Sequence, residues 1–387
     1  MNSPEARRPM PDPSRILVRG TNWLGDAVMT TPALVRLREK FPDAHIALFT
    51  PKKLRDLWLN HPAVNETITF APDENLLSIL RKLRAGHFDT ALVLPNSPHS
   101  ALEIWLAGIP RRIGHARPWR NWFLIQAIAP RREAVKMRKL SIVEIRRRTG
   151  VSPVSVQNKN NMETGKMPVL RPTAHQIHEY LHLAAALGAD PEPVPPQLFV
   201  TPNEVAGVKK KFGLNDMKWP IFGLNPGAEY GPAKRWPLEK FIAVAHEVQQ
   251  RTNCTWLVFG GQADETIARR IESAIASPPT AVLDFAGKTS LRELMVLLRI
   301  CRVLLTNDTG PMHVAAALGT PVVVPFGSTS PELTGPGLPG DERHRLLKSA
   351  VPCSPCFLRK CPIDFRCMNN ITVDQVVHAV MSTIPAA

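Results

Sequence analysis

Residues 302–319, RVLLTNDTGPMHVAAALG, contain the pattern that decides the fold. The apolar run RVLL predicts a short buried strand, and VAAALG predicts a helix that begins a few residues later. A strand that runs directly into a helix is typical of α/β proteins, in which parallel strands alternate with helices. The polar turn TNDTG puts free backbone amides at the start of the helix, where a phosphate group binds favourably.

The same alternation occurs in both halves of the chain. Short apolar runs predict strands at 16–18, 45–50, 90–95, 221–225, 255–261, 281–287, 302–308 and 321–327. Helical patterns lie between them, for example from Asp26 to Lys40. A chain of 387 residues is long enough for two domains. We therefore expect an α/β fold of two Rossmann-like domains facing across a cleft, with ligands at the carboxyl ends of the strands.

Composition predicts how the chain is divided. The expected segments are 1–14, 15–188, 189–204, 205–365 and 366–387. The first is a flexible N-terminus, and the second is a domain with a mobile basic insertion near 131–172, which is polar and aperiodic. The third is a proline-rich linker, and the fourth is the second domain. We expect the last segment to form a helix that packs back towards the first domain.

The charge is strongly basic, with 48 Lys and Arg against 33 Asp and Glu and a net charge of +15. Such a balance favours an anionic partner, which leaves nucleic acid, a membrane surface or a phosphorylated substrate. Residues 111–148 hold twelve Lys or Arg and two Glu. This region is either a solvated basic arm or a patch that meets lipid headgroup phosphates. The charge leaves a non-catalytic nucleic-acid-binding protein as an alternative of another class. The basic residues lack interleaved aromatics in a recognisable module, so we expect no nucleic-acid partner.

No apolar stretch approaches the length of a membrane span, and the N-terminus lacks the apolar core of a signal peptide. We therefore expect a cytoplasmic protein, whose six cysteines are reduced unless they bind metal.

The turn after the first predicted strand is GTNWLGD, residues 20–26. Asp26 and Ala27 stand where a phosphate-binding P-loop needs Lys and Ser or Thr, and the three-glycine dinucleotide fingerprint is missing. A carboxylate at a helix start has two interpretations. It is either a helix cap or a general base that deprotonates a hydroxyl group.

The second half begins with NPGAEYGPAKRWP, residues 225–237. A rigid Gly/Pro loop after a strand, with one Lys, suits pyrophosphate binding, because amides and Lys234 neutralise charge on a leaving group. In the segment 306–313, Asp308 is placed to accept hydrogen bonds from sugar hydroxyls. His313 lies in the first turn of the predicted helix, either as a structural histidine or as part of the anion site.

Four motifs in this order resemble the ADP-heptose:lipopolysaccharide heptosyltransferase family: NWLGD, VLPNSPHSALEIWLAGIPRRIGH, NPGAEYGPAKRWP and TNDTGPMHVAAALGTPVVVPFGSTSP. The resemblance covers most of residues 15–335. It implies a glycosyltransferase-B fold and inverting, metal-independent transfer of heptose from ADP-heptose, with no cofactor required. The implied acceptor is the Kdo2–lipid A core that already carries one heptose, and the alternative is another core acceptor. The first domain would bind the acceptor and the second ADP-heptose.

The resemblance also implies roles for individual residues. Asp26 matches the catalytic base and Lys234 the lysine that contacts the donor phosphates. The implied donor-binding residues are Asn225, Gly227, Lys234, Glu265, Thr289, Asp308, Thr309, Gly310 and His313. Among them Glu265 would contact the ribose and Thr289 would line the adenine pocket. The expected acceptor-binding residues are Asn22, Trp23, Arg111, Arg112, Arg117 and Arg120.

The partners that follow are the sugar nucleotide, the Kdo–lipid A core and peripheral contact with the inner leaflet of the cytoplasmic membrane, for a protein expected to be a monomer. A sensor of sugar nucleotides without turnover is a further alternative, but a sensor has no need of a base such as Asp26.

Four of the six cysteines lie within fifteen residues, at positions 353, 356, 361 and 367. Four close thiols can bind zinc tetrahedrally, and the first pair has the usual ligand spacing, whereas the later spacings are less typical. The alternatives for Cys353, Cys356, Cys361 and Cys367 are therefore a structural zinc site, reduced free thiols or a redox-active pair. We expect no catalytic metal.

Overall fold

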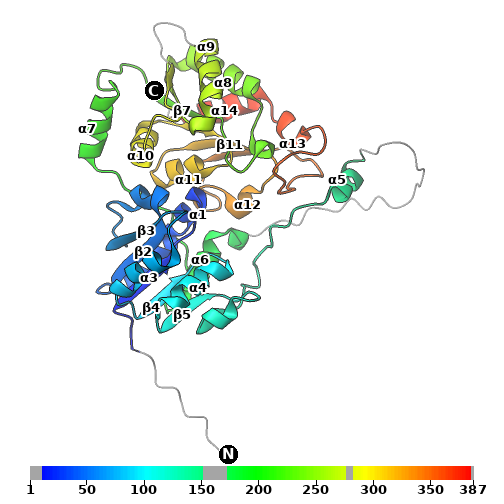
Figure 1. Cartoon of the computed structure of the whole chain (residues 1–387). Coiled ribbons are helices and arrows are strands. Elements are labelled where there is room, and N and C mark those ends of the chain that lie inside the picture. The colour runs from blue at the N-terminus through cyan, green and yellow to red at the C-terminus, as the bar shows by residue number, and fades with distance from the viewer. Residues whose placement is uncertain (1–10, 151–171, 276–281, 385–387) are drawn as a thin grey trace, which may run out of the picture. The chain divides into compact units, whose positions relative to one another are not determined.

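The computed structural model describes residues 11–150, 172–275 and 282–384. Within them it contains two six-stranded parallel sheets with helices between successive strands (Figure 1). This confirms the expected α/β class with two Rossmann-like sheets. Contacts divide the chain into two compact units, each with one sheet. The first unit extends to Asn22 and adds Pro32–Arg131 and Glu179–Glu192, and the second comprises Trp23–Thr31, Arg132–His178 and the residues from Pro193 onward.

The strands of the first sheet lie in the order β3-β2-β1-β4-β5-β6. Their bounds are β1 (Arg15–Arg19), β2 (His45–Pro51), β3 (Glu66–Phe70), β4 (Thr90–Val93), β5 (Arg111–His115) and β6 (Gln126–Ile128). The three strands predicted from apolar runs are β1, β2 and β4, and their residues are buried on both faces. A strand that is covered on both faces has a continuous apolar sequence, which is easy to recognise. Strands β3, β5 and β6 lie nearer the edges of the sheet and carry polar residues, so the sequence did not predict them.

The helical elements of the N-terminal half are α1 (Leu24–Met29), α2 (Thr31–Lys40), η1 (Lys52–Trp58), α3 (Leu76–Ala85), α4 (Pro98–Leu106), η2 (Asn121–Phe123), α5 (Ile142–Thr149), η3 (Pro172–Ala174) and α6 (Ile177–Ala185). The single helix expected from Asp26 to Lys40 is divided at Thr30 into α1 and α2. Pro32 in the first turn of α2 explains the division, since proline has no N–H to continue a preceding helix.

The strands of the second sheet lie in the order β12-β11-β10-β7-β8-β9. Their bounds are β7 (Ile221–Asn225), β8 (Thr255–Val258), β9 (Val282–Asp284), β10 (Leu304–Thr306), β11 (Val322–Phe326) and β12 (Arg345–Lys348). The five strands predicted in this half are confirmed, and the edge strand β12 was missed. The helical elements are α7 (Pro202–Lys211), η4 (Pro232–Lys234), α8 (Leu238–Thr252), η5 (Gln262–Asp264), α9 (Glu265–Ile275), α10 (Leu291–Ile300), α11 (Gly310–Ala317), α12 (Pro331–Thr334), α13 (Arg366–Asn369) and α14 (Val373–Ser382).

The last helix, α14, differs from the expectation that it packs towards the first domain. It packs against α8, β11 and β12 of the second unit. Val376, Val377 and Val380 are buried in the same apolar core as Trp236 and Trp256. The reason is its amphipathic pattern, whose apolar face covers the second sheet.

Within its described residues 131–150, the segment predicted as a mobile insertion contains the helix α5. A capping box between Ser141 and Glu144 begins this helix, and Gly150 in a left-handed conformation ends it. Residues 151–171 of the predicted insertion and most of the predicted flexible N-terminus lie outside the described residues. In the part of the chain that the structure describes, no helix has the length and apolar character needed to cross a bilayer.

Candidate active site

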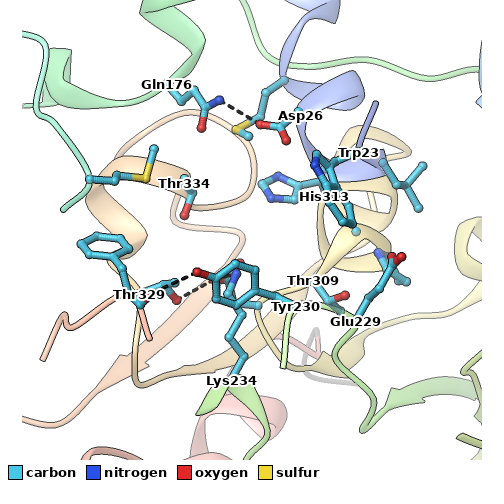
Figure 2. Close-up of a pocket in the computed structure, with 18 of the residues that line it drawn as sticks. Trp23, Asp26, Gln176, Glu229, Tyr230, Lys234, Thr309, His313, Thr329 and Thr334 are labelled. Carbon is cyan, nitrogen blue, oxygen red and sulfur yellow. Dashed lines mark hydrogen bonds and ion pairs between the residues drawn. The ribbon is translucent and has the colours of Figure 1, made fainter. Parts of the chain in front are cut away.

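A cavity of about 570 Å³ lies within the second unit (Figure 2). Its walls come from α1, the segment before α5, the loop around η4, the turn from β10 into α11, and the loop after β12. The lining residues are Trp23, Leu24, Gly25, Asp26, Met29, Met137, Lys139, Gln176, Glu229, Tyr230, Lys234, Asp308, Thr309, Gly310, Pro311, His313, Thr329, Thr334, Phe357 and Arg359. The three segments that sequence analysis singled out, around Asp26, Lys234 and Asp308, therefore meet at one cavity.

Asp26 belongs to this unit because α1 packs closely on α11. Two glycines allow the approach. A Cβ atom on Gly310 would lie 2.9 Å from Cβ of Leu24, and one on Gly25 would lie 2.7 Å from Cδ2 of His313. Larger side chains at either position would push the helices apart, so these glycines bring the carboxylate of Asp26 to the start of α11.

The carboxylate of Asp26 is not a helix cap. The N-cap residue of α1 is Trp23, and Asp26 lies in the first turn. Its Oδ1 atom accepts a hydrogen bond from Nε2 of Gln176 at 2.8 Å (Figure 2). The cap interpretation is therefore wrong, and the carboxylate is held by a side chain that lies far away in the sequence.

Lys234 and Asp308 form a buried ion pair in the cavity wall. Nζ of Lys234 lies 2.7 Å from Oδ2 of Asp308, and the hydroxyl of Thr329 donates to the same oxygen at 2.5 Å. The ammonium group also lies 5.0 Å from the ring centroid of Tyr230. An ammonium with a carboxylate on one side and an aromatic face on another is fixed in position, ready to contact an anionic ligand.

The turn from β10 into α11 supplies an anion-binding helix start. Thr309 is the N-cap residue of α11, and Gly310 is its first residue. The amides of a first helical turn have no partner within the helix, and the helix dipole favours negative charge there. Because both residues line the cavity, these amides supplement Lys234 as a binding site for phosphate.

His313 is buried beneath this site, and burial lowers its pKa to about 4. The imidazole is therefore neutral at physiological pH and adds no positive charge to those of the lysines and the arginine that line the cavity. In Figure 2 its ring lies between the Asp26–Gln176 pair and the side chain of Lys234.

Four expected donor residues do not line this cavity: Asn225, Gly227, Glu265 and Thr289. The side-chain amide of Asn225 donates to Oγ1 of Thr306 at 3.0 Å, which ties β7 to β10. A Cβ atom on Gly227 would lie 2.4 Å from Oδ2 of Asp264, so this glycine is required by packing.

The expected acceptor residues are dispersed. Trp23 lines the cavity with half of its surface exposed. Asn22, Arg111, Arg112, Arg117 and Arg120 belong to the first unit. Asn22 accepts a hydrogen bond from Nη1 of Arg19 at 3.1 Å.

Two of these arginines have structural roles, which corrects the expectation for Arg120. Arg120 is 0% exposed, and its guanidinium donates to the carbonyl oxygens of Val93 and His115 at 3.0 and 3.1 Å. Arg112 donates to the carbonyl oxygens of Phe123 and Ile109 at 2.8 and 2.5 Å. Both side chains help to fix the loop after β5. Burial leaves the guanidinium of Arg120 unable to hold an acceptor, whereas Arg112 is half-buried and its contact with an acceptor stays a prediction.

Sequence reasoning missed several residues of the cavity. Gln176 reaches Asp26 because its backbone is anchored beside α12: its N–H donates to the carbonyl of Leu333 at 2.9 Å, and Nε2 of the preceding His175 lies 3.0 Å from the carbonyl oxygen of Gly335. No local pattern marks this glutamine. Tyr230, by contrast, belongs to the loop 225–237, and its closeness to Lys234 in the sequence could have predicted that it lines the same cavity.

The four clustered cysteines line a separate cavity of only about 10 Å³, together with apolar side chains such as Ile363 and Phe365. All four are free thiols, and burial raises the pKa of Cys367 to about 12. Among residues 11–150, 172–275 and 282–384, no three His, Cys, Asp or Glu side chains are arranged to hold a metal ion. The geometry therefore does not support the zinc interpretation, because these thiols are not arranged around one point where an ion could bind.

Comparisons with known proteins point to one family. A family model described as glycosyltransferase family 9 (heptosyltransferase) matches residues 141–365. Lipopolysaccharide heptosyltransferase 2 of Escherichia coli K12 is 31% identical over 336 residues, which cover 83% of this chain and 85% of that protein. Lipooligosaccharide heptosyltransferase 2 of Haemophilus ducreyi is 29% identical over 336 residues, which cover 83% and 86% of the two chains.

A solved structure supports the same assignment. The E. coli ADP-heptose lps heptosyltransferase II matches with a TM-score of 0.74 and 27% identity, over 95% of this chain and 98% of that one. The likeness extends over both sheets, which confirms the fold class that the motifs implied. From the family model and the relatives together, this chain belongs to glycosyltransferase family 9, the heptosyltransferase family.

Proposed function

We propose that this protein is an inverting heptosyltransferase that moves L-glycero-D-manno-heptose from ADP-heptose to the inner core of lipopolysaccharide. The observation that carries the proposal is a single cavity, which contains the start of a helix, the half-buried carboxylate of Asp26 and the fixed ammonium group of Lys234. A volume of about 570 Å³ is typical of sites for ligands of this size. Membership of the heptosyltransferase family supports the choice of sugar.

In the proposed reaction Asp26 is the general base. It removes the proton from an acceptor hydroxyl as the oxygen attacks the anomeric carbon of heptose. The bond between that carbon and the diphosphate oxygen breaks on the opposite face, so the configuration inverts and ADP leaves. One carboxylate is sufficient, because the leaving diphosphate needs stabilisation of negative charge and no proton.

The leaving group is proposed to bind Lys234 and the amides of Thr309 and Gly310. Asp308 holds Lys234 by an ion pair and is placed to accept hydrogen bonds from heptose hydroxyls. Glu265 and Thr289 remain our candidates for the ribose and the adenine. Glu265 lies beside the turn that leads to Thr289, since a Cβ atom on Gly287 would lie 3.1 Å from Oε1 of Glu265.

For the acceptor we propose the Kdo2–lipid A core that already carries one heptose, which is the reaction of heptosyltransferase II. The relatives named heptosyltransferase 2 favour it, and the second candidate is the reaction of heptosyltransferase I or III. The test is ADP release from ADP-heptose with purified Kdo2–lipid A, with and without the first heptose. Turnover only on the heptosylated acceptor supports the proposal, turnover on the bare acceptor supports heptosyltransferase I, and turnover on neither refutes both.

Metal removal is expected to leave the reaction unchanged. Lys234 and the amides at the start of α11 provide the positive charge that neutralises the diphosphate. We therefore expect the same kcat after treatment with excess EDTA as in buffer containing magnesium, measured by ADP release with metal-free coupling reagents. Inhibition by EDTA that magnesium reverses contradicts the metal-independent mechanism.

Gln176 is expected to act as a positioning residue through its hydrogen bond to Asp26. A donated hydrogen bond stabilises the ionised carboxylate over the protonated one, and it also fixes the direction of the accepting lone pair. For Gln176→Ala we expect kcat to fall about tenfold, which corresponds to roughly 1.4 kcal/mol, close to the lower limit for a hydrogen bond to a charged group. The acid limb of the pH–rate profile should move to higher pH.

The pH profile separates positioning from a loss of structure. Gln176→Glu has nearly the same shape but replaces the donor by a second acidic group, so it should shift the acid limb further than alanine does. KM for ADP-heptose should stay within a few-fold in both variants. A lower kcat with an unmoved acid limb assigns Gln176 a packing role instead.

We further propose that the protein is a cytoplasmic monomer that contacts the inner leaflet of the cytoplasmic membrane peripherally. Its acceptor is a membrane lipid, and its net charge of +15 favours an anionic surface.

A further inference from the structure

The loop between β5 and β6 exposes an unusual set of large apolar side chains in the first unit. The exposed fractions are 81% for Trp119, 84% for Trp122 and 61% for Ile125. Trp105 on α4, itself 45% exposed, adjoins them through Phe123, whose ring centroid lies 5.7 Å from its own. We call these four exposed side chains, Trp105, Trp119, Trp122 and Ile125, the tryptophan face. Large apolar side chains that are exposed close together mark an interaction surface for a protein, a ligand or a membrane.

The backbone holds this loop in place rather than leaving it loose. Trp119 has a φ of 63°, a left-handed conformation that costs a bulky residue about 1–2 kcal/mol. The buried guanidinium of Arg120, bound to the carbonyls of Val93 and His115, fixes the next residue. A Cβ atom on Gly114 would lie 2.6 Å from Nη2 of Arg120, so β5 itself leaves room for this anchor. The strained residue thus presents its indole to solvent from a rigid base.

The charge around the face identifies the partner. Residues 104–132 contain six arginines and no Asp or Glu. Glu103, next to this range in the sequence, is paired with Arg19 at 3.2 Å, and Glu179 is paired with Arg131 at 2.9 Å. The surroundings of the exposed indoles are therefore net positive. Tryptophan prefers the headgroup level of a bilayer, and each arginine near an anionic bilayer contributes attraction.

We infer that the tryptophan face is the surface by which this protein docks on a bilayer containing anionic phospholipid, with Trp119 and Trp122 inserted at the headgroup level. The inference deepens the membrane contact stated under the proposed function by assigning residues and a lipid class to it. Binding is expected to depend on insertion of the indoles and on attraction between the arginines and the lipid headgroups. It should therefore require anionic lipid and weaken as the salt concentration is raised.

The test uses the full chain and sedimentation with vesicles of phosphatidylglycerol and phosphatidylethanolamine, or of phosphatidylcholine alone. The wild type should bind the first and leave the second in the supernatant. The double variant Trp119→Ser/Trp122→Ser should lose at least about tenfold in partition coefficient. Trp219→Ser, which removes a 36%-exposed tryptophan of the second unit, is the matched control and should bind as the wild type does.

A second measurement reports contact between the indoles and the bilayer directly. Brominated acyl chains should quench tryptophan emission of the wild type and of Trp219→Ser, and quench the double variant much less. Equal binding by the double variant, or no preference of the wild type for anionic vesicles, overturns the inference. A dimer of the wild type that the double variant abolishes, without vesicle binding, assigns the face to a second copy of the chain and also overturns it.

Transfer assays with a soluble and with a membrane-embedded acceptor distinguish this inference from the proposed function. Transfer to a deacylated, soluble core acceptor should be the same in the wild type and in the double variant, whereas transfer to acceptor embedded in vesicles should fall. If no heptose is transferred at all, the proposed function fails while the vesicle result still decides the docking surface.

Discussion

Asp26→Asn should reduce kcat by about 10²–10⁴-fold, the contribution typical of a positioned general base. The substitution keeps the size and the hydrogen-bonding shape of the side chain but removes its ability to take a proton from the acceptor hydroxyl. Because Lys234 and the start of α11 are untouched, ADP-heptose affinity should stay within a few-fold. Single-turnover rates at saturating acceptor, with donor affinity from calorimetry, measure the two effects separately.

The cavity offers a matched control for this variant. Glu229 also lines it and carries a carboxylate, but its side chain is exposed, whereas Asp26 is half-buried and oriented by Gln176. Glu229→Gln should therefore retain activity within a few-fold. If instead Asp26→Asn were nearly as active as the wild type and Glu229→Gln were inactive, the base would have been assigned to the wrong carboxylate.

The predicted parts of the fold and of the site share one property: their signal is local. The central strands are continuous apolar runs because parallel sheets are covered on both faces. The residues at the start of α11 follow directly from a strand that runs into a helix. Lys234 stands in a loop with too many glycines and prolines for an ordinary surface turn. Each of these features can be read from about a dozen neighbouring residues.

The parts that could not be predicted depend on contacts between distant segments. Gln176 reaches Asp26 across 150 residues of sequence, and its placement depends on backbone hydrogen bonds to residues beside α12. Arg120 resembled an acceptor-binding arginine in sequence, yet burial makes it the anchor of its own loop. Likewise α14 was expected on the first domain, and only the surrounding core shows which sheet its apolar face covers.

Lys234→Ala should lower kcat/KM roughly 30- to 1,000-fold if the ammonium stabilises charge that develops on the departing ADP. This factor corresponds to a loss of about 2–4 kcal/mol of transition-state stabilisation. The effect should appear in both donor affinity and kcat, because the diphosphate is charged in the ground state and gains charge in the transition state. This pattern differs from that of Asp26→Asn, in which donor affinity is retained. ADP release across a range of donor concentrations, at fixed acceptor, gives both constants.

The ion pair with Asp308 complicates a single substitution, since Lys234→Ala leaves a buried carboxylate without its cation. Breaking one partner of a buried pair costs about 3–5 kcal/mol in stability, so part of the lost activity would come from an altered site. The double variant Lys234→Ala/Asp308→Ala removes both charges. We expect it to recover most of the free energy of unfolding, measured by urea denaturation, yet to remain as slow as Lys234→Ala. Recovery of activity along with stability would show that Lys234 supports the structure of the site and not the leaving group.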